Sequence, residues 1–512
     1  MYSIIETLLG RAMLHRFILF GSILVSAFFS LSAASPADEK MVALLKNFEK
    51  YAEEQRVLWK IPGMAIAIVK DQDVVLEKGF GQRGIKNTQP VDQNTLFQIG
   101  SLSKAFTSTL LAIANDRDLL KWEDKVIHHL PSFHLYDPWV TAEFQVNDLC
   151  AQRSGLPPYA GDYQATLGFS ADEIFHHLAY IKPLTSFRAD YAYQNSFFLV
   201  ASKILENKLS ATFPILLHRE IFVPLNMKNS NASLHEYLAS PNRAEWLMRL
   251  KNGSTEIVKE DFPFLNWNYT LGPAGGINST VSDMSKWLIL QANQGQFEGV
   301  ELVSKKNMRF LRRPGIYAGE LEEHNMFYAQ GWLHIENTPY PVILHDGSTL
   351  GVYNVAAFIP EEKLGIVILT NVRNTRLALA LALQFFDQYF GKPDKNWSQH
   401  FLEQSQKAEP KTEAPQNISP PLPLHLYTGT YINPIYGELL VKIENKNLVL
   451  SLGKITQTFT LSHWDRDIFT LEDPFSGELP SKVSFLLNKD GIVSTVQLEF
   501  LSKEGAGDFI KK

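Results

Sequence analysis

Strand-like segments stand near both ends of the first 390 residues, and helix-like segments fill the long stretch between them. Residues 64–78 and 353–370 each contain two runs of β-favouring residues around a polar turn, which is typical of β-hairpins. Residues 101–231 carry apolar helical periods that proline and glycine loops interrupt. Both hairpins need a partner that buries their apolar side chains. We therefore predict one antiparallel sheet built from distant segments and flanked by helices, an α/β (α+β) fold.

The first 34 residues have the organisation of a signal peptide. Arg11, His15 and Arg16 precede the apolar run 17–31, and small residues follow at 32–34. The run is short for a bilayer span, which takes about 20 residues. We therefore expect a periplasmic or secreted protein with no stable membrane span after cleavage. An uncleaved membrane anchor stays open, because hydropathy alone does not decide cleavage.

The chain changes character after residue 391. Six prolines mixed with Lys, Glu and Gln occupy 391–424, which predicts an extended or poorly ordered linker. Residues 427–509 offer short alternating runs separated by turns, and this spacing predicts a small antiparallel barrel or sandwich. We accordingly divide the chain into four parts: a signal peptide (1–34), a main domain (35–391), a Pro-rich linker (392–424) and a small all-β domain (425–512).

Composition limits the partners of the protein. Hydrophobic residues make up 45% of the chain and charged residues 20%, which is ordinary for a globular protein with a sizeable core. The net charge of −6 argues against nucleic acid as the main partner. Cys150 is the only cysteine, so no internal disulfide can form. Its apolar neighbours favour packing over a catalytic thiol.

Ser101 and Lys104 are the first candidates for chemistry. Residues three apart on a helix lie about 5–6 Å apart on one face, and residues 104–120 have a helical apolar period. Serine needs a neighbouring base to act as a nucleophile. Lysine is such a base only where burial or nearby positive charge makes its neutral form accessible. The same spacing at Ser451 and Lys454 falls on a predicted strand, where the two side chains point to opposite faces, so we reject it.

Two further motifs complete a known pattern. They are Tyr193-Gln194-Asn195 and His345-Asp346-Gly347, the latter directly after an apolar run. With Ser101 and Lys104, they resemble the three signature elements of the penicillin-binding protein and class C β-lactamase superfamily. The resemblance covers about residues 45–390 in the family's order, with weaker matches at 148–157, 224–227 and 272–283.

The resemblance implies a β-lactamase/transpeptidase-like fold and an acyl-enzyme on Ser101. Lys104 would take the Ser101 proton, and Tyr193 would carry it to the leaving group and help to activate water. Asn195 would hold the lysine and the substrate by hydrogen bonds. The backbone N–H groups of Ser101 and Ser348 would form the oxyanion hole. The implied substrate-binding residues are Asn195, His345, Gly347 and Ser348.

His345 marks a departure from the family pattern. β-Lactamases and many transpeptidases carry a lysine here, a cation that attracts the carboxylate of the antibiotic. Histidine, with a pKa near 6.5, is mostly neutral at pH 7. Histidine-x-glycine resembles the version found among esterases and D-amino-acid peptidases of the superfamily. We therefore expect weak β-lactam hydrolysis, and turnover that depends on pH between about 6 and 7 through His345.

We expect no cofactor and no metal ion. The histidines His128, His129 and His134 lack an acidic residue at the spacing of zinc peptidases. The C-terminal region, which begins at Tyr427, resembles the lipocalin-like barrels appended to some of these peptidases. Such a barrel can shape the substrate cleft or build a homo-oligomer, and a spacer or stabilising module is the open alternative.

The sequence thus predicts an exported serine hydrolase that acts on a small-molecule or peptide substrate through an acyl-serine intermediate. A D-amino-acid or cell-wall-peptide peptidase is the first candidate. A carboxylesterase or a class C-type β-lactamase is the alternative. A catalytically inactive binding or scaffold protein is a further alternative, which the intact Ser101, Lys104 and Tyr193 disfavour.

Overall fold

The computed structural model describes residues 36–512 except 251–252, 263, 338, 394, 407–414, 416, 455–457 and 472–479. The predicted signal peptide at 1–34 lies outside the described residues. Within the described part of the chain, no helix combines the length and the apolar character needed to cross a membrane.

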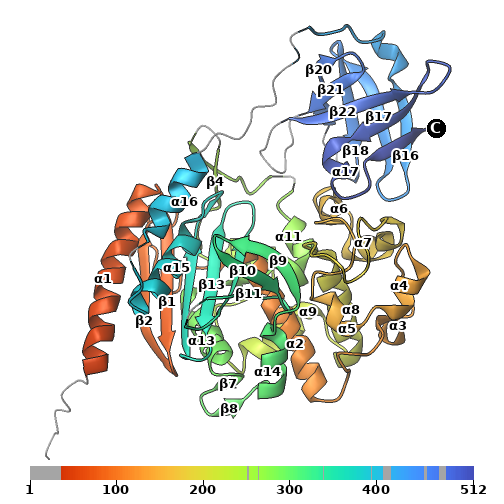
Figure 1. Cartoon of the computed structure of the whole chain (residues 1–512). Helices are drawn as coiled ribbons and strands as arrows, with labels where there is room; N and C mark the ends of the chain where they lie inside the picture. Colours follow the sequence, from red (N-terminus) through yellow and green to blue (C-terminus); the bar gives the residue numbers. More distant parts are fainter. Residues whose placement is uncertain are drawn as a thin grey trace, which may run out of the picture.

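Eight strands form one antiparallel sheet in the order β2-β1-β14-β13-β12-β11-β10-β9 (Figure 1). Met64 faces Thr370 where β1 pairs with β14, so the first hairpin joins the last one. The prediction of one sheet built from distant segments is confirmed. The strands are β1 (Gly63–Lys70), β2 (Asp73–Gly81), β9 (Ile316–Leu321), β10 (His324–Tyr328), β11 (Leu333–Ile335), β12 (Val342–Ser348), β13 (Tyr353–Ile359) and β14 (Leu364–Thr370).

Helices cover both faces of this sheet. Side chains on β1 alternate between two cores, because successive residues of a strand point to opposite faces. Ile66 and Ile68 enter the core closed by α1, α15 and α16, whereas Ala65 and Ala67 enter the core shared with α2 and α13. The helices are α1 (Pro36–Leu58), α2 (Ser103–Asp116), α13 (Val281–Ala292), α15 (Leu377–Tyr389) and α16 (Trp397–Gln406).

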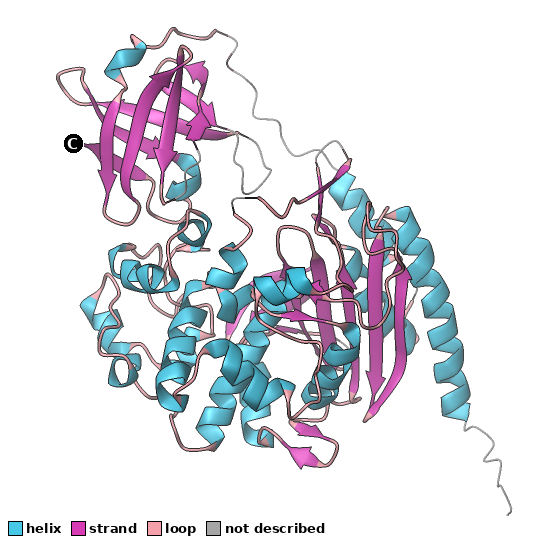
Figure 2. Cartoon of the chain, turned by 180° about the vertical axis from the view of Figure 1, so that it is seen from behind, coloured by secondary structure: helices cyan, strands magenta, loops and turns pink. Residues whose placement is uncertain are grey.

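The segment between the hairpins is mainly helical, and its helices gather beside the sheet (Figure 2). Helix α2 ends at Asp116, earlier than the predicted Leu120, because Asp118 takes a left-handed conformation with φ +55°. The helices are α3 (Val126–His129), α4 (Pro138–Glu143), α5 (Val146–Leu149), α6 (Asp162–Thr166), α7 (Ala171–His177), α8 (Ser196–Leu209), α9 (Phe213–Leu217), α10 (Leu234–Ala239), α11 (Trp267–Thr270), α12 (Gly272–Gly275) and α14 (Lys305–Arg312). Short strands complete the domain: β3 (Phe97–Gln98), β4 (Leu247–Arg249), β5 (Thr255–Ile257), β6 (Asn278–Ser279), β7 (Gln296–Phe297), β8 (Val300–Glu301) and β15 (Val372–Arg373).

The C-terminal region is a nearly closed barrel of nine strands within the described residues, in the order β19-β18-β17-β16-β24-β23-β22-β21-β20. Its two edge strands, β19 and β20, are consecutive in the chain, so the sheet curls back on itself. Tyr427 and Phe485 pack in its core with tilted rings whose centroids are 4.7 Å apart. The predicted all-β barrel is confirmed. Its elements are β16 (Gly429–Asn433), β17 (Gly437–Glu444), β18 (Asn447–Leu452), β19 (Thr458–Thr460), β20 (Ser462–Asp465), β21 (Ile468–Leu471), β22 (Ser481–Leu487), β23 (Val493–Leu498), α17 (Glu499–Ser502) and β24 (Asp508–Lys511).

The predicted Pro-rich linker at 392–424 is wrong over its first part. Residues 397–406 form helix α16, which packs on α15 through the buried side chains of Trp397 and Phe401. These residues are four apart and therefore share one helical face. The Trp397 indole also donates a hydrogen bond to Asp387 at 2.6 Å. The prolines had suggested an extended chain, but the first of them, Pro393, precedes this helix.

Candidate active site

Ser101 sits on a tight turn that leads into the central helix of the main domain. Residues Gly100–Leu102 form one turn of 3₁₀-helix, and α2 follows at once. Gly100 has φ +56°, a left-handed conformation that suits glycine. This turn presents the Ser101 hydroxyl at the start of α2, and it places Lys104 one helical turn further along, as the spacing predicted.

Lys104 is fully buried and its amine contacts three oxygen atoms. Nζ lies 3.0 Å from Oγ of Ser101, 2.6 Å from Oδ1 of Asn195 and 3.0 Å from the carbonyl oxygen of Ala274. Burial lowers the pKa of Lys104 from its usual value to about 7. A sizeable share of neutral amine is therefore present at neutral pH, which is the condition that a lysine base requires.

Tyr193 is the second group at the serine hydroxyl. Its hydroxyl donates a hydrogen bond to Oγ of Ser101 at 2.7 Å. Burial, followed by the charge of neighbouring Tyr328, raises the pKa of Tyr193 well above 10. The lysine amine lies over the Tyr193 ring, 4.7 Å from its centroid. Tyr193 is therefore protonated in this state, although the lysine amine stands beside its ring.

Asn195 links the lysine to a buried carboxyl group that the sequence analysis missed. Asn195 immediately precedes α8. Its Oδ1 accepts from Lys104, and its Nδ2 donates to Oδ2 of Asp162 at 2.6 Å. Burial raises the pKa of Asp162 to about 7. A chain of polar groups thus runs from Asp162 through Asn195 and Lys104 to Ser101.

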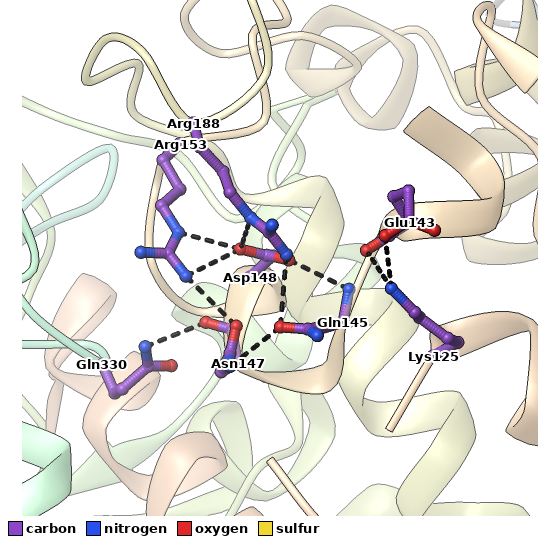
Figure 3. Close-up of polar contacts among 8 residues, drawn as sticks. All are labelled: Lys125, Glu143, Gln145, Asn147, Asp148, Arg153, Arg188 and Gln330. Carbon is purple, nitrogen blue, oxygen red and sulfur yellow. Dashed lines mark hydrogen bonds and ion pairs between the residues drawn. The ribbon is translucent and has the colours of Figure 1, made fainter. Parts of the chain in front are cut away.

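A network of hydrogen bonds around Asp148 includes Arg188, which precedes Tyr193 in the same segment of the chain (Figure 3). Arg188 donates to both Asp148 oxygens, at 3.0 and 2.6 Å, and Arg153 donates to Oδ1 at 2.8 Å. The Asp148 side chain has no exposed surface. Bidentate arginine–carboxylate pairs of this kind fix geometry as well as adding energy. The network therefore anchors the segment that precedes Tyr193 against α5.

His345 lies on β12 at the wall of the site, but it differs from the expectation. Its Nδ1 donates to the carbonyl oxygen of Asp346 at 2.5 Å, and its Nε2 lies 3.0 Å from the Tyr328 hydroxyl. The ring is 1% exposed, and burial lowers the pKa of His345 to about 4. The expected titration of His345 between pH 6 and 7 is therefore wrong, because burial removes the hydration that would stabilise the charged ring.

Two glycines let the end of β12 approach the serine turn. A side chain at Gly347 would meet the carbonyl oxygen of Ile99 at 2.0 Å, and one at Gly100 would meet the backbone nitrogen of Ser348 at 2.7 Å. Larger residues therefore cannot stand at either position without a shift of the backbone. The backbone nitrogen of Ser348 thus lies against the turn that carries Ser101.

These groups face one cavity of about 620 Å³. Of the seven predicted site residues, Ser101, Tyr193, Asn195, His345 and Ser348 line it. Lys104 lies behind the serine, and Gly347 packs against the serine turn. Other lining residues are mainly aromatic or acidic: Tyr159, Asp162, Tyr163, Tyr191, Phe264, Trp267, Tyr328, Asp346 and Glu504.

The chain belongs to the beta-lactamase family, since the family description "Beta-lactamase" matches residues 48–385. Residues 413–507 match a second family, described as a domain of unknown function (DUF3471). An unguisins hydrolase, ungD, of Aspergillus violaceofuscus is 25% identical over 483 residues, which are 85% of this chain and 84% of the relative. Protein flp of Staphylococcus aureus (strain MW2) is 24% identical over 330 residues, 61% of this chain and 60% of the relative.

Two solved structures share the fold. A penicillin-binding protein homologue from Pyrococcus abyssi, described as octameric, superposes with a TM-score of 0.60 at 22% identity, covering 91% of this chain and 100% of that one. SurE, solved with D-Leu, superposes with a TM-score of 0.54 at 16% identity, covering 92% and 100%. Because the family description matches and a relative over most of the chain is named a hydrolase, the chain is a serine hydrolase of the β-lactamase family.

Three site residues had no recognisable signal in the sequence. Asp162 begins the short helix α6, Tyr328 ends β10, and Glu504 comes from the C-terminal barrel. None lies at a helical or strand spacing from Ser101, so no local pattern connects them with it. Only the tertiary structure brings them to the cavity.

Proposed function

We propose that this protein is an exported peptidase that cleaves amide bonds of small peptides containing D-residues through an acyl-enzyme on Ser101. The observation that carries the proposal is the joint contact of the Lys104 amine and the Tyr193 hydroxyl with the Ser101 hydroxyl. A nucleophile, an amine that is partly neutral at pH 7 and a protonated phenol are together what acylation and leaving-group protonation require.

In the proposed acylation, neutral Lys104 takes the proton of Ser101 while Oγ bonds to the substrate carbonyl carbon. The backbone N–H groups of Ser101 and Ser348 would bind the oxyanion. As the carbon–nitrogen bond breaks, Tyr193 gives its proton to the departing amine and regains one from Lys104. Water then attacks the acyl-enzyme, with the same groups taking its proton and returning one to Ser101 Oγ. Asn195 would hold the lysine and the substrate amide in place.

The replacement of the family's lysine by His345 favours peptides over β-lactams. His345 is neutral, and the neighbouring Asp346 carboxylate is about half exposed. A substrate that carries a carboxylate next to its reacting carbonyl finds no lysine at this position, where many relatives present one, although Arg373 and Lys503 line the same cavity. The tyrosine-rich walls suit apolar and aromatic side chains. SurE, which shares the fold, was solved with D-Leu, and this supports D-residues as the substrate class.

A carboxylesterase is the second candidate, because the same acyl-serine chemistry cleaves an ester with an easier leaving group. Export is part of the proposal and is supported by the signal-like segment at 1–34. A homo-oligomer is supported only by the Pyrococcus abyssi homologue, whose structure is described as octameric.

The test measures hydrolysis rates of D- and L-configured dipeptides, p-nitrophenyl esters and nitrocefin, with the Ser101→Ala variant as the control. We expect D-containing peptides to give the highest kcat/KM and nitrocefin the lowest. Faster ester than peptide hydrolysis would favour the esterase. A labelled fluorophosphonate should form an adduct on Ser101, and a folded protein without any adduct would favour a binding or scaffold protein.

A further inference from the structure

Glu504 is a buried carboxyl group that the barrel carries into the hydrolase domain. It follows α17 in a turn closed by two hydrogen bonds to the carbonyl oxygen of Leu501, from the N–H groups of Glu504 and Ala506, both at 3.1 Å. Asn433 of β16 donates to the carbonyl oxygen of Ala506 at 3.1 Å. The turn is therefore anchored to the barrel, yet Glu504 is 2% exposed and lines the cavity of Ser101.

The Glu504 carboxylate accepts two backbone N–H groups of the main domain. One oxygen accepts from Gly161 at 3.1 Å and the other from Tyr163 at 3.2 Å. These residues flank Asp162, the first residue of α6. The N–H groups at a helix start have no partner within the helix, so an acidic acceptor from the barrel fixes the backbone on both sides of Asp162.

Asp162 is the outer end of the polar chain that leads to the nucleophile. Its Oδ2 accepts from Asn195 at 2.6 Å, and Asn195 in turn accepts from Lys104 at 2.6 Å. Its Oδ1 is buried and has no hydrogen-bond partner among the described residues. The Asp162 side chain is held by the hydrogen bond from Asn195, so the position of its carboxyl group depends on the backbone that Glu504 anchors.

Aromatic side chains from both domains surround the contact of Glu504. Phe500 packs edge-on against Tyr163 with ring centroids 5.0 Å apart. The groups that titrate near Glu504 are Asp162 and Tyr163 of the main domain and Tyr436 of the barrel, whose hydroxyl lies 3.4 Å from the carboxylate. Burial, then the Asp162 charge, raises the pKa of Glu504 well above 4.5.

We propose that Glu504 is a positioning residue for the hydrolase reaction: the barrel supplies the cap that holds Asp162, and through Asp162 and Asn195 it sets the place of the Lys104 amine. The barrel is thereby part of the active site and not a spacer. This inference rests on the proposed function, because it assigns Glu504 an effect on acylation of Ser101. A displacement of about 1 Å in such a chain can slow catalysis about 100-fold.

The test compares second-order rates of Ser101 labelling by a fluorophosphonate in the full-length chain. We expect Glu504→Gln to label about 10- to 100-fold more slowly than the wild type. Lys454→Ala is the matched control, because Lys454 forms another contact between barrel and main domain, with Glu173, away from the polar chain. It should stay within about threefold of the wild type. Glu504→Gln within threefold of the wild type would overturn the proposal.

A double variant separates positioning from general stabilisation. If Glu504 acts through Asp162, Glu504→Gln combined with Asp162→Asn should label at the rate of Asp162→Asn alone. If the double variant instead labels more slowly by the product of the two single effects, the proposal is overturned. Should Glu504→Gln not fold, Glu504→Asp, whose carboxylate is one methylene shorter, takes its place in the same comparison.

Hydrogen exchange keeps this result distinct from a failure of the proposed function. Exchange at the Gly161 and Tyr163 amides should be faster in Glu504→Gln than in the wild type, whether or not Ser101 reacts. A wild type that takes no label would refute the proposed function, and unchanged exchange would refute the cap. Labelling of the wild type with unchanged rates in Glu504→Gln would refute the positioning role alone.

Discussion

The Tyr328 hydroxyl lies 3.0 Å from Nε2 of His345, in the wall of the cavity that Ser101 lines. The other ring nitrogen, Nδ1, contacts the carbonyl oxygen of Asp346, which can only accept. His345 is therefore a neutral ring that carries its proton on Nδ1 and accepts a hydrogen bond from the Tyr328 hydroxyl at Nε2. The histidine that replaces the family's lysine is a buried structural partner of Tyr328, with no free charge for a substrate.

The pH dependence should accordingly come from Lys104. Its pKa is lowered to about 7 by burial, so the amine is mostly protonated below that pH and mostly neutral above it. Labelling of Ser101 is expected to rise with pH through about 7 and to level off above it. His345→Gln should keep this rise at the same pH, because the pKa of His345 is about 4. If His345→Gln no longer showed this rise, His345 and not Lys104 would be the titrating group.

Removal of one oxygen atom should isolate the role of Tyr193. Tyr193→Phe keeps the ring that packs against Tyr159 and Tyr328, with centroids 5.4 and 6.4 Å away. It loses the proton donor at Ser101, and we expect kcat to fall about 10²- to 10⁴-fold. The melting temperature should change little. Tyr191→Phe, at the same cavity, is the control, and an equal loss in both variants would contradict the assignment.

The approach of β12 to the serine turn can be tested with one methyl group. In Gly347→Ala, the added carbon would stand 2.0 Å from the Ile99 carbonyl oxygen, so β12 must move away and take the Ser348 N–H with it. We expect the free energy of unfolding to fall by about 1–3 kcal/mol and labelling of Ser101 to slow at least about tenfold. Gly272→Ala, where open space surrounds the added carbon, should leave both unchanged. Equal labelling rates for the two variants would argue against the oxyanion role.

The Asp148 network should matter for stability as well as for catalysis. Asp148→Asn removes the charge that Arg153 and Arg188 share, and we expect the free energy of unfolding to fall by about 2–3 kcal/mol in urea denaturation. Glu143→Gln breaks the more exposed pair with Lys125 in the same region and should cost less than about 1 kcal/mol (Figure 3). If both variants cost the same, the network does not anchor the Tyr193 segment.

Features encoded within one element could be predicted from the sequence. The distance between Ser101 and Lys104 follows from helical spacing, and the second Ser–Lys pair was correctly rejected because Ser451 lies on β18. The hairpins and the barrel follow from side-chain alternation and turn residues, which depend on neighbours in the chain. The likeness of separate motifs to the family indicated which distant residues belong together.

Only the tertiary structure decided which side chains are buried and which groups from distant segments contact each other. Burial away from water lowers the pKa values of His345 and Lys104, and no sequence pattern measures that burial. Glu504 binds the backbone on both sides of Asp162 because a turn of the barrel docks on the start of α6, some 340 residues earlier, a distance that local periodicity does not reach. The sequence by itself determined that Ser101 and Lys104 come together, because they share one helical turn. The fold decided the protonation and the position of the side chains around them, because the local dielectric and the contacts between distant segments arise only when those segments pack together.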